Sequence, residues 1–196
     1  VRLLAELGVN LETPDNLGGT PVWAAAQKDH VEVVRLLAQL GATVVTPHAV
    51  GATPAFIAAH DGHVEVVRLL AELGANVETP DNGGCTPAYS AAEKGHVDVV
   101  RLLAELGANV NTPNNNGATP AFVAAQKGHA EVVRLLAELG ADVDTPANDG
   151  ATPAYVAAQE GHLEVVRVLA ELRANVNTPN NKGATPAYIA AYQGHA

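Results

Sequence analysis

The sequence predicts an all-α repeat solenoid of stacked helix-turn-helix units with β-hairpin-like finger loops, and two series of Thr-Pro pairs support this prediction. The first series recurs every 33 residues from Thr20 to Thr185, and the second recurs at the same interval from Thr13 to Thr178. Together the two series contain all 12 prolines. Of the 18 glycines, 16 keep to three further positions of the same period. Self-similarity at a period of about 20–50 residues is typical of a repeat architecture.

Each unit opens with a short helix, for which TPAFVAAQKG at 119–128 serves as the example. Thr119 is a preferred N-cap residue, because its side-chain oxygen can accept a hydrogen bond from a free backbone amide. Pro120 suits the first helical position, where no amide donor is needed. Gly128 is a typical helix terminator.

A second helix is predicted over AEVVRLLAEL at 130–139, which places apolar residues on one broad face and ends before Gly140. Glu131 and Glu138 lie three and four residues from Arg134, so a ladder of charges is expected on the solvent side. The remaining residues of the unit, ADVDTPANDGA, are polar and rich in turn formers. They predict an extended, hairpin-like finger loop.

Neither helix of a unit can bury its apolar face alone, whereas stacked neighbours share one continuous core. The whole chain, 1–196, is therefore predicted to be a single solenoid domain. The predicted full repeats are 20–52, 53–85, 86–118, 119–151 and 152–184, with partial repeats at 1–19 and 185–196.

The repeated unit resembles the ankyrin repeat in its period and in the order of its segments: T-P, A-A, G-H, V-V-R-L-L and L-G-A-N-V. The resemblance extends over essentially the whole chain. It implies paired antiparallel helices with projecting fingers. It also implies a non-catalytic scaffold that binds another protein through the finger loops and the concave face of the first helices.

One position departs from the family pattern, since an aromatic ring replaces the histidine usual after Thr-Pro. The six rings are Trp23, Phe56, Tyr89, Phe122, Tyr155 and Tyr188. Successive repeats lie roughly 10 Å apart, about one helix diameter, whereas paired rings lie about 4.5–7 Å apart. We therefore expect each ring to be buried among aliphatic side chains. A ligand groove lined by the rings is the alternative.

Two substitutions break the glycine positions, Asp29 after a first helix and Arg173 after a second helix. Losing a glycine where the backbone is left-handed costs on the order of 1 kcal/mol. A locally weakened interface between repeats is therefore predicted near Arg173, with faster amide exchange in residues 163–178 than in residues 130–145.

The charge pattern excludes several classes of partner. The chain carries a formal net charge of −10, and six of its 11 basic residues are arginines spaced 33 apart. Nucleic acid and anionic membrane surfaces need clustered Lys and Arg, so neither is expected as a partner. No apolar run is long enough to span a bilayer. The single cysteine, Cys85, excludes an intrachain disulfide framework and favours an intracellular, cytoplasmic location.

The sequence predicts no catalytic residues, no metal site and no cofactor. Six histidines recur between the two helices of each unit, from His30 to His195, and are expected to hydrogen-bond a turn or a helix end. His60 and His63 lie three apart without a third ligand, so adventitious metal binding is the only metal hypothesis. No carboxylates are paired by local spacing as an acid and a base.

Variation is concentrated at the fingertips and at the ends of the first helices, and this predicts the partner-binding surface. The most apolar stretch, 45–61, contributes Val45, His48, Val50 and His60. The complete set of candidate residues is Val45, His48, Val50, His60, Asp61, Asp81, Asn82, Glu93, Lys94, Asn114, Asn115, Asn116, Gln126, Lys127, Asn148, Asp149, Gln159 and Glu160. Random drift of exposed positions is the alternative explanation for the variation.

A structural spacer or self-assembling rod is the alternative function. The chain opens with VRLLAELG, the latter part of a second helix, and closes with TPAYIAAYQGHA, a first helix. The tail of one molecule and the head of the next could complete a repeat, so end-to-end self-association is an expected possibility.

Overall fold

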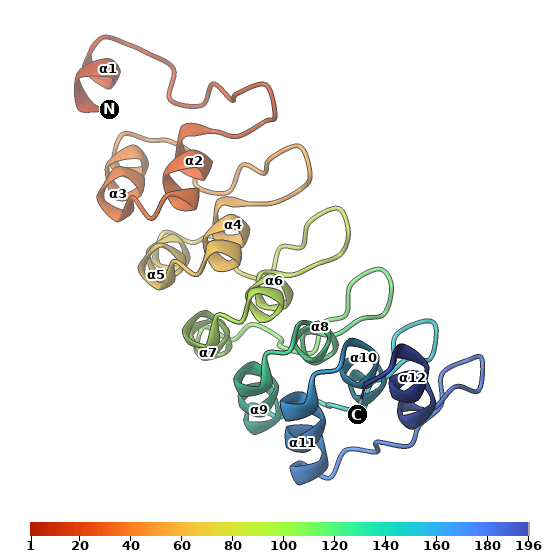
Figure 1. The fold of residues 1–196 in the computed structure, drawn as a ribbon. Coiled ribbons are helices and arrows are strands. Elements are labelled where there is room, and N and C mark those ends of the chain that lie inside the picture. Colours follow the sequence, from red (N-terminus) through yellow and green to blue (C-terminus); the bar gives the residue numbers. More distant parts are fainter. Residues whose placement is uncertain (196) are drawn as a thin grey trace.

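A computed structural model describes residues 1–195, and the chain forms twelve α-helices and no strand within them. The helices alternate between two rows with a finger loop after each pair, which confirms the predicted all-α solenoid (Figure 1). The first helices of the units are α2 (Pro21–Gln27), α4 (Pro54–Asp61), α6 (Pro87–Lys94), α8 (Pro120–Lys127), α10 (Pro153–Glu160) and α12 (Pro186–Gln193). The second helices are α1 (Arg2–Glu6), α3 (Val31–Gln39), α5 (Val64–Glu72), α7 (Val97–Glu105), α9 (Ala130–Glu138) and α11 (Leu163–Glu171).

The first helices begin as predicted, at a threonine N-cap followed by proline. Thr119 Oγ1 accepts a hydrogen bond from the backbone N–H of Phe122 at 3.2 Å, and the five equivalent threonines do the same. The sides of these helices that meet their neighbours are lined by alanines such as Ala124 and Ala125, which are fully buried. Their small size lets the first helices pack directly on one another from α2 to α12.

The second helices supply the larger core side chains. In α7, Val99, Val100, Leu102 and Leu103 are buried, whereas Arg101 is exposed. This is the broad apolar face that the sequence predicts. Each second helix from α3 to α11 packs on its own first helix, and consecutive second helices from α3 to α11 pack on one another.

The aromatic rings follow the packing prediction in the inner repeats only. Phe56, Tyr89, Phe122 and Tyr155 are buried, between 6 and 9% exposed. The stacked aromatic pairs in the described part of the chain are Trp23 with His48 and Tyr188 with Tyr192, so the rings form no continuous stack.

For the two outermost rings the prediction of burial is wrong. Tyr188 is 61% exposed, because α12 packs on α10 and its other side is open. Trp23 is half-buried, although its indole N–H donates to the carbonyl of Ala52 at 3.0 Å.

Asp29 and Arg173 are the non-glycine residues with left-handed backbone in the described chain, at φ 56° and 63°. This is the conformation expected for them from the glycines at the equivalent positions. Replacing Arg173 with glycine is therefore expected to raise the free energy of unfolding by about 1 kcal/mol. Urea denaturation measures this difference, and Arg134→Gly, a change inside helix α9, is the control that must destabilise.

The exchange pattern predicted for Arg173 gives a second readout. Amides in residues 163–178 should exchange faster than those in 130–145, and Arg173→Gly should reduce the difference. Equal protection of the two segments in the wild-type chain would contradict the predicted weak interface.

The predicted charge ladder within α9 is replaced by a contact between repeats. Arg134 Nη2 lies 2.8 Å from Glu171 Oε2 on α11 instead of pairing within its own helix. Pairs at i,i+3 do form in two other second helices, Arg35 with Glu32 and Arg167 with Glu164. These exposed pairs contribute little to stability individually.

Candidate functional site

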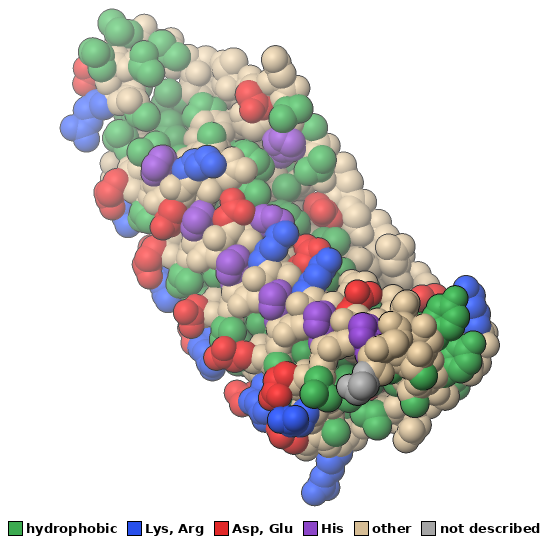
Figure 2. Space-filling view, in the orientation of Figure 1, with side chains coloured by type: hydrophobic (Ala, Val, Ile, Leu, Met, Phe, Trp, Pro, Cys, Tyr) green, Lys and Arg blue, Asp and Glu red, His purple; other side chains and the backbone are tan. Residues whose placement is uncertain are grey.

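The candidate residues occupy two parallel rows that run the length of the solenoid. One row is formed by the tips of the finger loops, and the other by the C-terminal ends of the first helices (Figure 1). Figure 2 shows a row of histidine side chains along the helix-end row, with Lys and acidic side chains beside it. Which candidates can meet a partner depends on what their polar atoms already bind.

Where it is Asp or Asn, the first residue of a fingertip closes its own turn. Asp81 Oδ1 accepts hydrogen bonds from the backbone N–H groups of Gly83 and Cys85, both at 2.9 Å. Asn114 makes the equivalent two bonds, and its Nδ2 also donates to the Tyr89 hydroxyl at 3.2 Å. Asp81 and Asn114 therefore shape the finger.

The second residue of each fingertip ties its finger to the preceding one. Asn115 donates through its backbone N–H to the carbonyl of Gly83 at 3.0 Å and through Nδ2 to the carbonyl of Asn82 at 3.2 Å. The same pair of bonds is made by Asn82, Asn148 and Asn181. Sequence reasoning placed Asn82, Asn115 and Asn148 at the partner, but their amides serve this ladder of asparagines. Ala49 breaks the ladder, since it has no side-chain amide to donate.

The third residue of most fingertips leaves its side chain free of these bonds. Asp149 is the exception, because its Oδ1 accepts from the backbone N–H of Ala151 at 3.0 Å. The backbone carbonyl of the third residue joins neighbouring fingers, as when Asn116 accepts from Asn148 N–H at 3.0 Å. The third residues are Leu17, Val50, Gly83, Asn116, Asp149 and Lys182, all exposed. Of the three fingertip positions, this one has the side chain best placed to contact a bound protein.

The helix-end row combines a fixed backbone with free side chains. His129 Nε2 bonds the carbonyl of Glu93 at 3.0 Å, and the other inner histidines bond the carbonyls of Gln27, His60, Gln126 and Gln159 in the same way. The histidines thus link each repeat to the preceding one instead of capping a local helix. The neighbouring side chains Lys94, Lys127 and Glu160 are exposed.

A serine, a histidine and a carboxylate meet at the end of α4, an arrangement that sequence reasoning missed. His60 Nδ1 lies 2.9 Å from Ser90 Oγ, and His60 Nε2 lies 3.8 Å from Asp61 Oδ1. Ser90 is only 2% exposed, so its hydroxyl cannot reach a substrate in this structure. Burial lowers the pKa of His60, aided by the nearby Lys94, so the ring is neutral at pH 7. The equivalent position in the other units holds Ala, Val or Ile, so Ser90 is the only polar residue there. This difference is the feature of the sequence that could have predicted the contact with His60.

The apolar stretch 45–61 does not form one surface. His48 stacks on Trp23 with ring centroids 4.8 Å apart, and Val50 stands exposed at the fingertip. His60 belongs to the helix-end row. Val45 lines a separate groove of about 510 Å³ between its own finger and the start of the next, together with Pro47, Asn76 and Pro80.

Val45 also interrupts a series of hydrogen bonds in which a side chain of one repeat accepts from a backbone N–H of the next. Glu78 Oε1 accepts from the backbone N–H of Asn109 at 2.6 Å, and Glu12, Asn111 and Asp144 make equivalent bonds. At Val45 the side chain offers the N–H of Asn76 no acceptor. Val45→Glu is therefore expected to stabilise the fold by about 0.5–1.5 kcal/mol. This corresponds to a Tm increase of about 2–4 °C per kcal/mol, measured by thermal unfolding.

Val50→Glu is the control for Val45→Glu, because it adds the same charge at an exposed fingertip without supplying that acceptor. An unchanged or lower Tm for Val45→Glu, relative to Val50→Glu, would contradict the assignment of this contact.

The family comparison agrees with this geometry. Models described as ankyrin repeats (3 copies) match residues 44–114, 80–147, 107–180 and 143–196, and a model of the single ankyrin repeat matches 17–47. The chain belongs to the ankyrin repeat family. The overlapping matches do not mark where one repeat ends, so the unit borders 20–52 to 152–184 stay a prediction. No curated protein matches the chain.

Ankyrin repeats generally act as protein–protein interaction modules, which fits two rows of exposed, variable side chains on a fixed frame. No helix described here has the length and apolar character needed to cross a membrane. Among residues 1–195, no three His, Cys, Asp or Glu side chains come together as a metal site.

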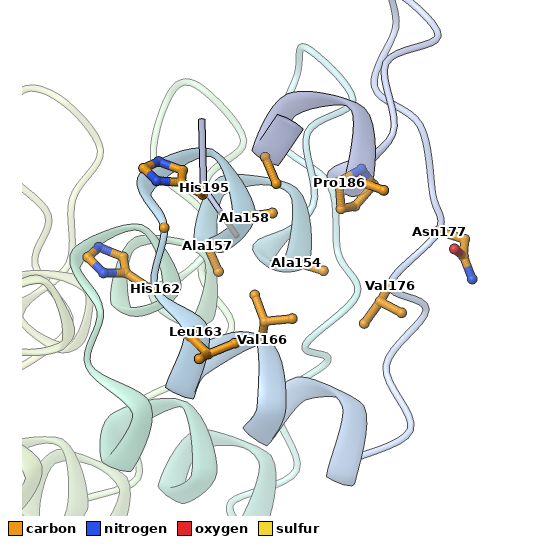
Figure 3. A pocket seen from close by; sticks show the side chains of 13 residues that line it. Ala154, Ala157, Ala158, His162, Leu163, Val166, Val176, Asn177, Pro186 and His195 are labelled. Atoms are coloured by element: carbon orange, nitrogen blue, oxygen red, sulfur yellow. The ribbon is translucent and has the colours of Figure 1, made fainter. Parts of the chain in front are cut away.

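The last ankyrin unit leaves a hollow of about 330 Å³ beside α10, α11 and α12. Its walls are mostly small and apolar, and include Ala154, Ala157, Val166 and Pro186 (Figure 3). His162 and His195 lie along one side (Figure 3). In the inner units a second helix packs against the corresponding first helices.

Proposed function

We propose that the chain is a non-catalytic scaffold that binds another protein through its finger loops and the exposed face of its first helices. The observation that carries this proposal is that the groups which hold the repeats together differ from the side chains which are exposed to solvent. Backbone groups and the asparagine and histidine ladders hold the repeats together, while the third fingertip residues and the helix-end side chains point outward with few bonds of their own.

Within the candidate set, this division favours certain residues over others. The side chains proposed to contact the partner are those of Val50, Asn116, Asp149, Lys94, Lys127, Gln126, Gln159 and Glu160. Asn82, Asn114, Asn115 and Asn148 are proposed to act indirectly, by shaping the fingers. The expected cytoplasmic location rests on the cysteine content and stays a prediction.

The test is capture of a partner with a surface variant in the central repeat. Asn116→Ser, Gln126→Ala and Lys127→Ala together remove exposed or half-buried side chains that make no bond of the two ladders. The matched control replaces Arg101, Glu105 and Glu131 on the second helices with alanine. A protein captured by the wild-type chain should bind the surface variant at least about tenfold more weakly, roughly 1.4 kcal/mol, and bind the control unchanged. Equal binding to both variants would refute the proposal.

A head-to-tail rod is the second candidate, and complementary end surfaces favour it. At one end Leu3, Leu4 and Leu7 are exposed, and at the other lies the apolar hollow beside α12. The contacts between repeats also match, because the register that joins Arg134 to Glu171 would join Arg167 of one copy to Glu6 of the next.

Sedimentation velocity of the 196-residue polypeptide tests the rod. Association that rises with concentration and is abolished by Leu3→Asp and Leu7→Asp would support it. A monomer at every concentration would eliminate it without affecting the proposed binding of another protein.

A further inference from the structure

The first two fingers carry tips unlike the others. Their third residues are Leu17 and Val50, which are 64% and 54% exposed, whereas Gly83, Asn116, Asp149 and Lys182 occupy this position elsewhere. Large aliphatic side chains held in water at a fingertip stabilise nothing in the fold. Isolated exposed aliphatic side chains need no explanation, but two on adjacent tips form a patch.

Backbone and aromatic contacts join these two tips into one surface. Ala49 donates its backbone N–H to the carbonyl of Leu17 at 3.1 Å, so the fingers lie side by side. Ala49 also replaces the asparagine of the ladder, which removes a polar group from between the two tips. Next to Val50, the His48 ring stacks on the half-buried Trp23. We call Leu17, Trp23, His48, Ala49 and Val50 the apolar fingertip patch.

Two carboxylates flank the apolar fingertip patch. Asp15 and Asp81 occupy the position equivalent to His48 on the preceding and following fingers. Each uses Oδ1 to bind two backbone N–H groups, which leaves Oδ2 without a bond in its own turn. The N–H groups of Gly19 and Leu17 hold the pKa of Asp15 below its ordinary value, so this side chain is ionised at neutral pH.

No basic residue offsets these charges within the three fingers concerned. Residues 9–20, 42–53 and 75–86 contain four acidic residues and no Lys or Arg. Figure 2 shows hydrophobic side chains with acidic ones on either side over these loops. An apolar centre between two carboxylates complements an apolar side chain between two cations, and the net charge of −10 attracts such a ligand from a distance.

We propose that the apolar fingertip patch binds an extended segment of a partner protein in which a large apolar residue lies between two Lys or Arg residues. This rests on the proposed protein-binding function and names its ligand chemistry. Adjacent repeats lie roughly 10 Å apart, so Asp15 and Asp81 are separated by roughly 20 Å. An extended chain rises about 3.3 Å per residue, which places the two basic residues about six positions apart.

The experiment uses a phage library of random 12-residue peptides, selected on the immobilised wild-type chain. Enriched peptides should carry an aliphatic or aromatic residue with Lys or Arg about three positions to each side. Their affinity, measured by fluorescence anisotropy, should fall at least tenfold for Leu17→Ser/Val50→Ser. Leu106→Ser/Leu139→Ser is the matched control, at exposed leucines that end two second helices outside the candidate set, and should change nothing.

A second pair of variants tests the charges without disturbing the turns. Asp15→Asn and Asp81→Asn keep the Oδ1 acceptor, and asparagine already closes the same turn at Asn114 and Asn180. Both variants should fold normally and bind the enriched peptides at least fivefold more weakly, and the double variant should lose most of the salt dependence of binding.

The possible outcomes separate this inference from the proposed function. Peptides lost with Leu17→Ser/Val50→Ser and weakened by the asparagine variants support the patch. Peptides that depend on Gln126 and Lys127 instead overturn the patch but leave the scaffold function intact. Enrichment that no fingertip or helix-end change affects overturns both.

Discussion

Replacing Leu103 with alanine is expected to lower the free energy of unfolding by about 2–5 kcal/mol. Leu103 lies in α7 at the middle of the solenoid, is 0% exposed and packs in the shared core of neighbouring repeats. Truncation removes apolar contacts from both sides of its repeat. The side chains around Leu103 cannot fill the resulting cavity unless the first helices separate. Those helices are already in close contact through their alanines.

Leu106→Ala is the matched control for Leu103. This leucine follows the same helix but is 39% exposed, so its truncation should cost less than about 1 kcal/mol. Urea denaturation followed by circular dichroism measures both changes. Similar losses for the two variants would mean that the core does not lie where the structure places it.

Replacing Gly84 with alanine is expected to destabilise the fold by about 2–4 kcal/mol. Gly84 has φ 77°, a conformation that costs an L-residue about 1–2 kcal/mol. An added Cβ would also overlap Asn115 Oδ1, whose side chain reaches past Gly84 to the carbonyl of Asn82. The fingers would have to separate, with loss of both bonds of that rung at about 0.5–1.5 kcal/mol each.

Gly107→Ala isolates the contribution of the ladder. Gly107 has nearly the same φ, 87°, but nothing lies within 4 Å of the place its Cβ would take. The loss of stability at Gly84 should therefore exceed the loss at Gly107 by at least about 1 kcal/mol. Equal losses would show that backbone strain alone is responsible and that the asparagine ladder contributes nothing.

The fold could be predicted because its signals are local. A threonine N-cap, a proline after it and a glycine at the helix end each act within one turn of backbone, so one unit such as 119–151 contains them all. Repetition then turns a local prediction into an architecture, since only stacking buries the apolar faces of Val132 or Leu136.

The role of the polar residues could not be predicted, because it depends on contacts about one repeat away. Asn115 and Asn116 are neighbours of the same type, yet the first is tied to the preceding finger and the second is free. The bond from His129 to Glu93 spans 36 residues and has no local signature. Arg134 likewise pairs with Glu171 on the next repeat and not with Glu131 or Glu138 on its own helix.

The most direct test of the binding face is hydrogen exchange of the chain with and without the protein partner that it captures. Binding should protect amides at the fingertips and the ends of the first helices, for example 114–118 and 126–129, and leave the second helices unchanged. Protection confined to second-helix segments such as 97–106 and 130–139 would contradict the proposal that the partner binds the finger face.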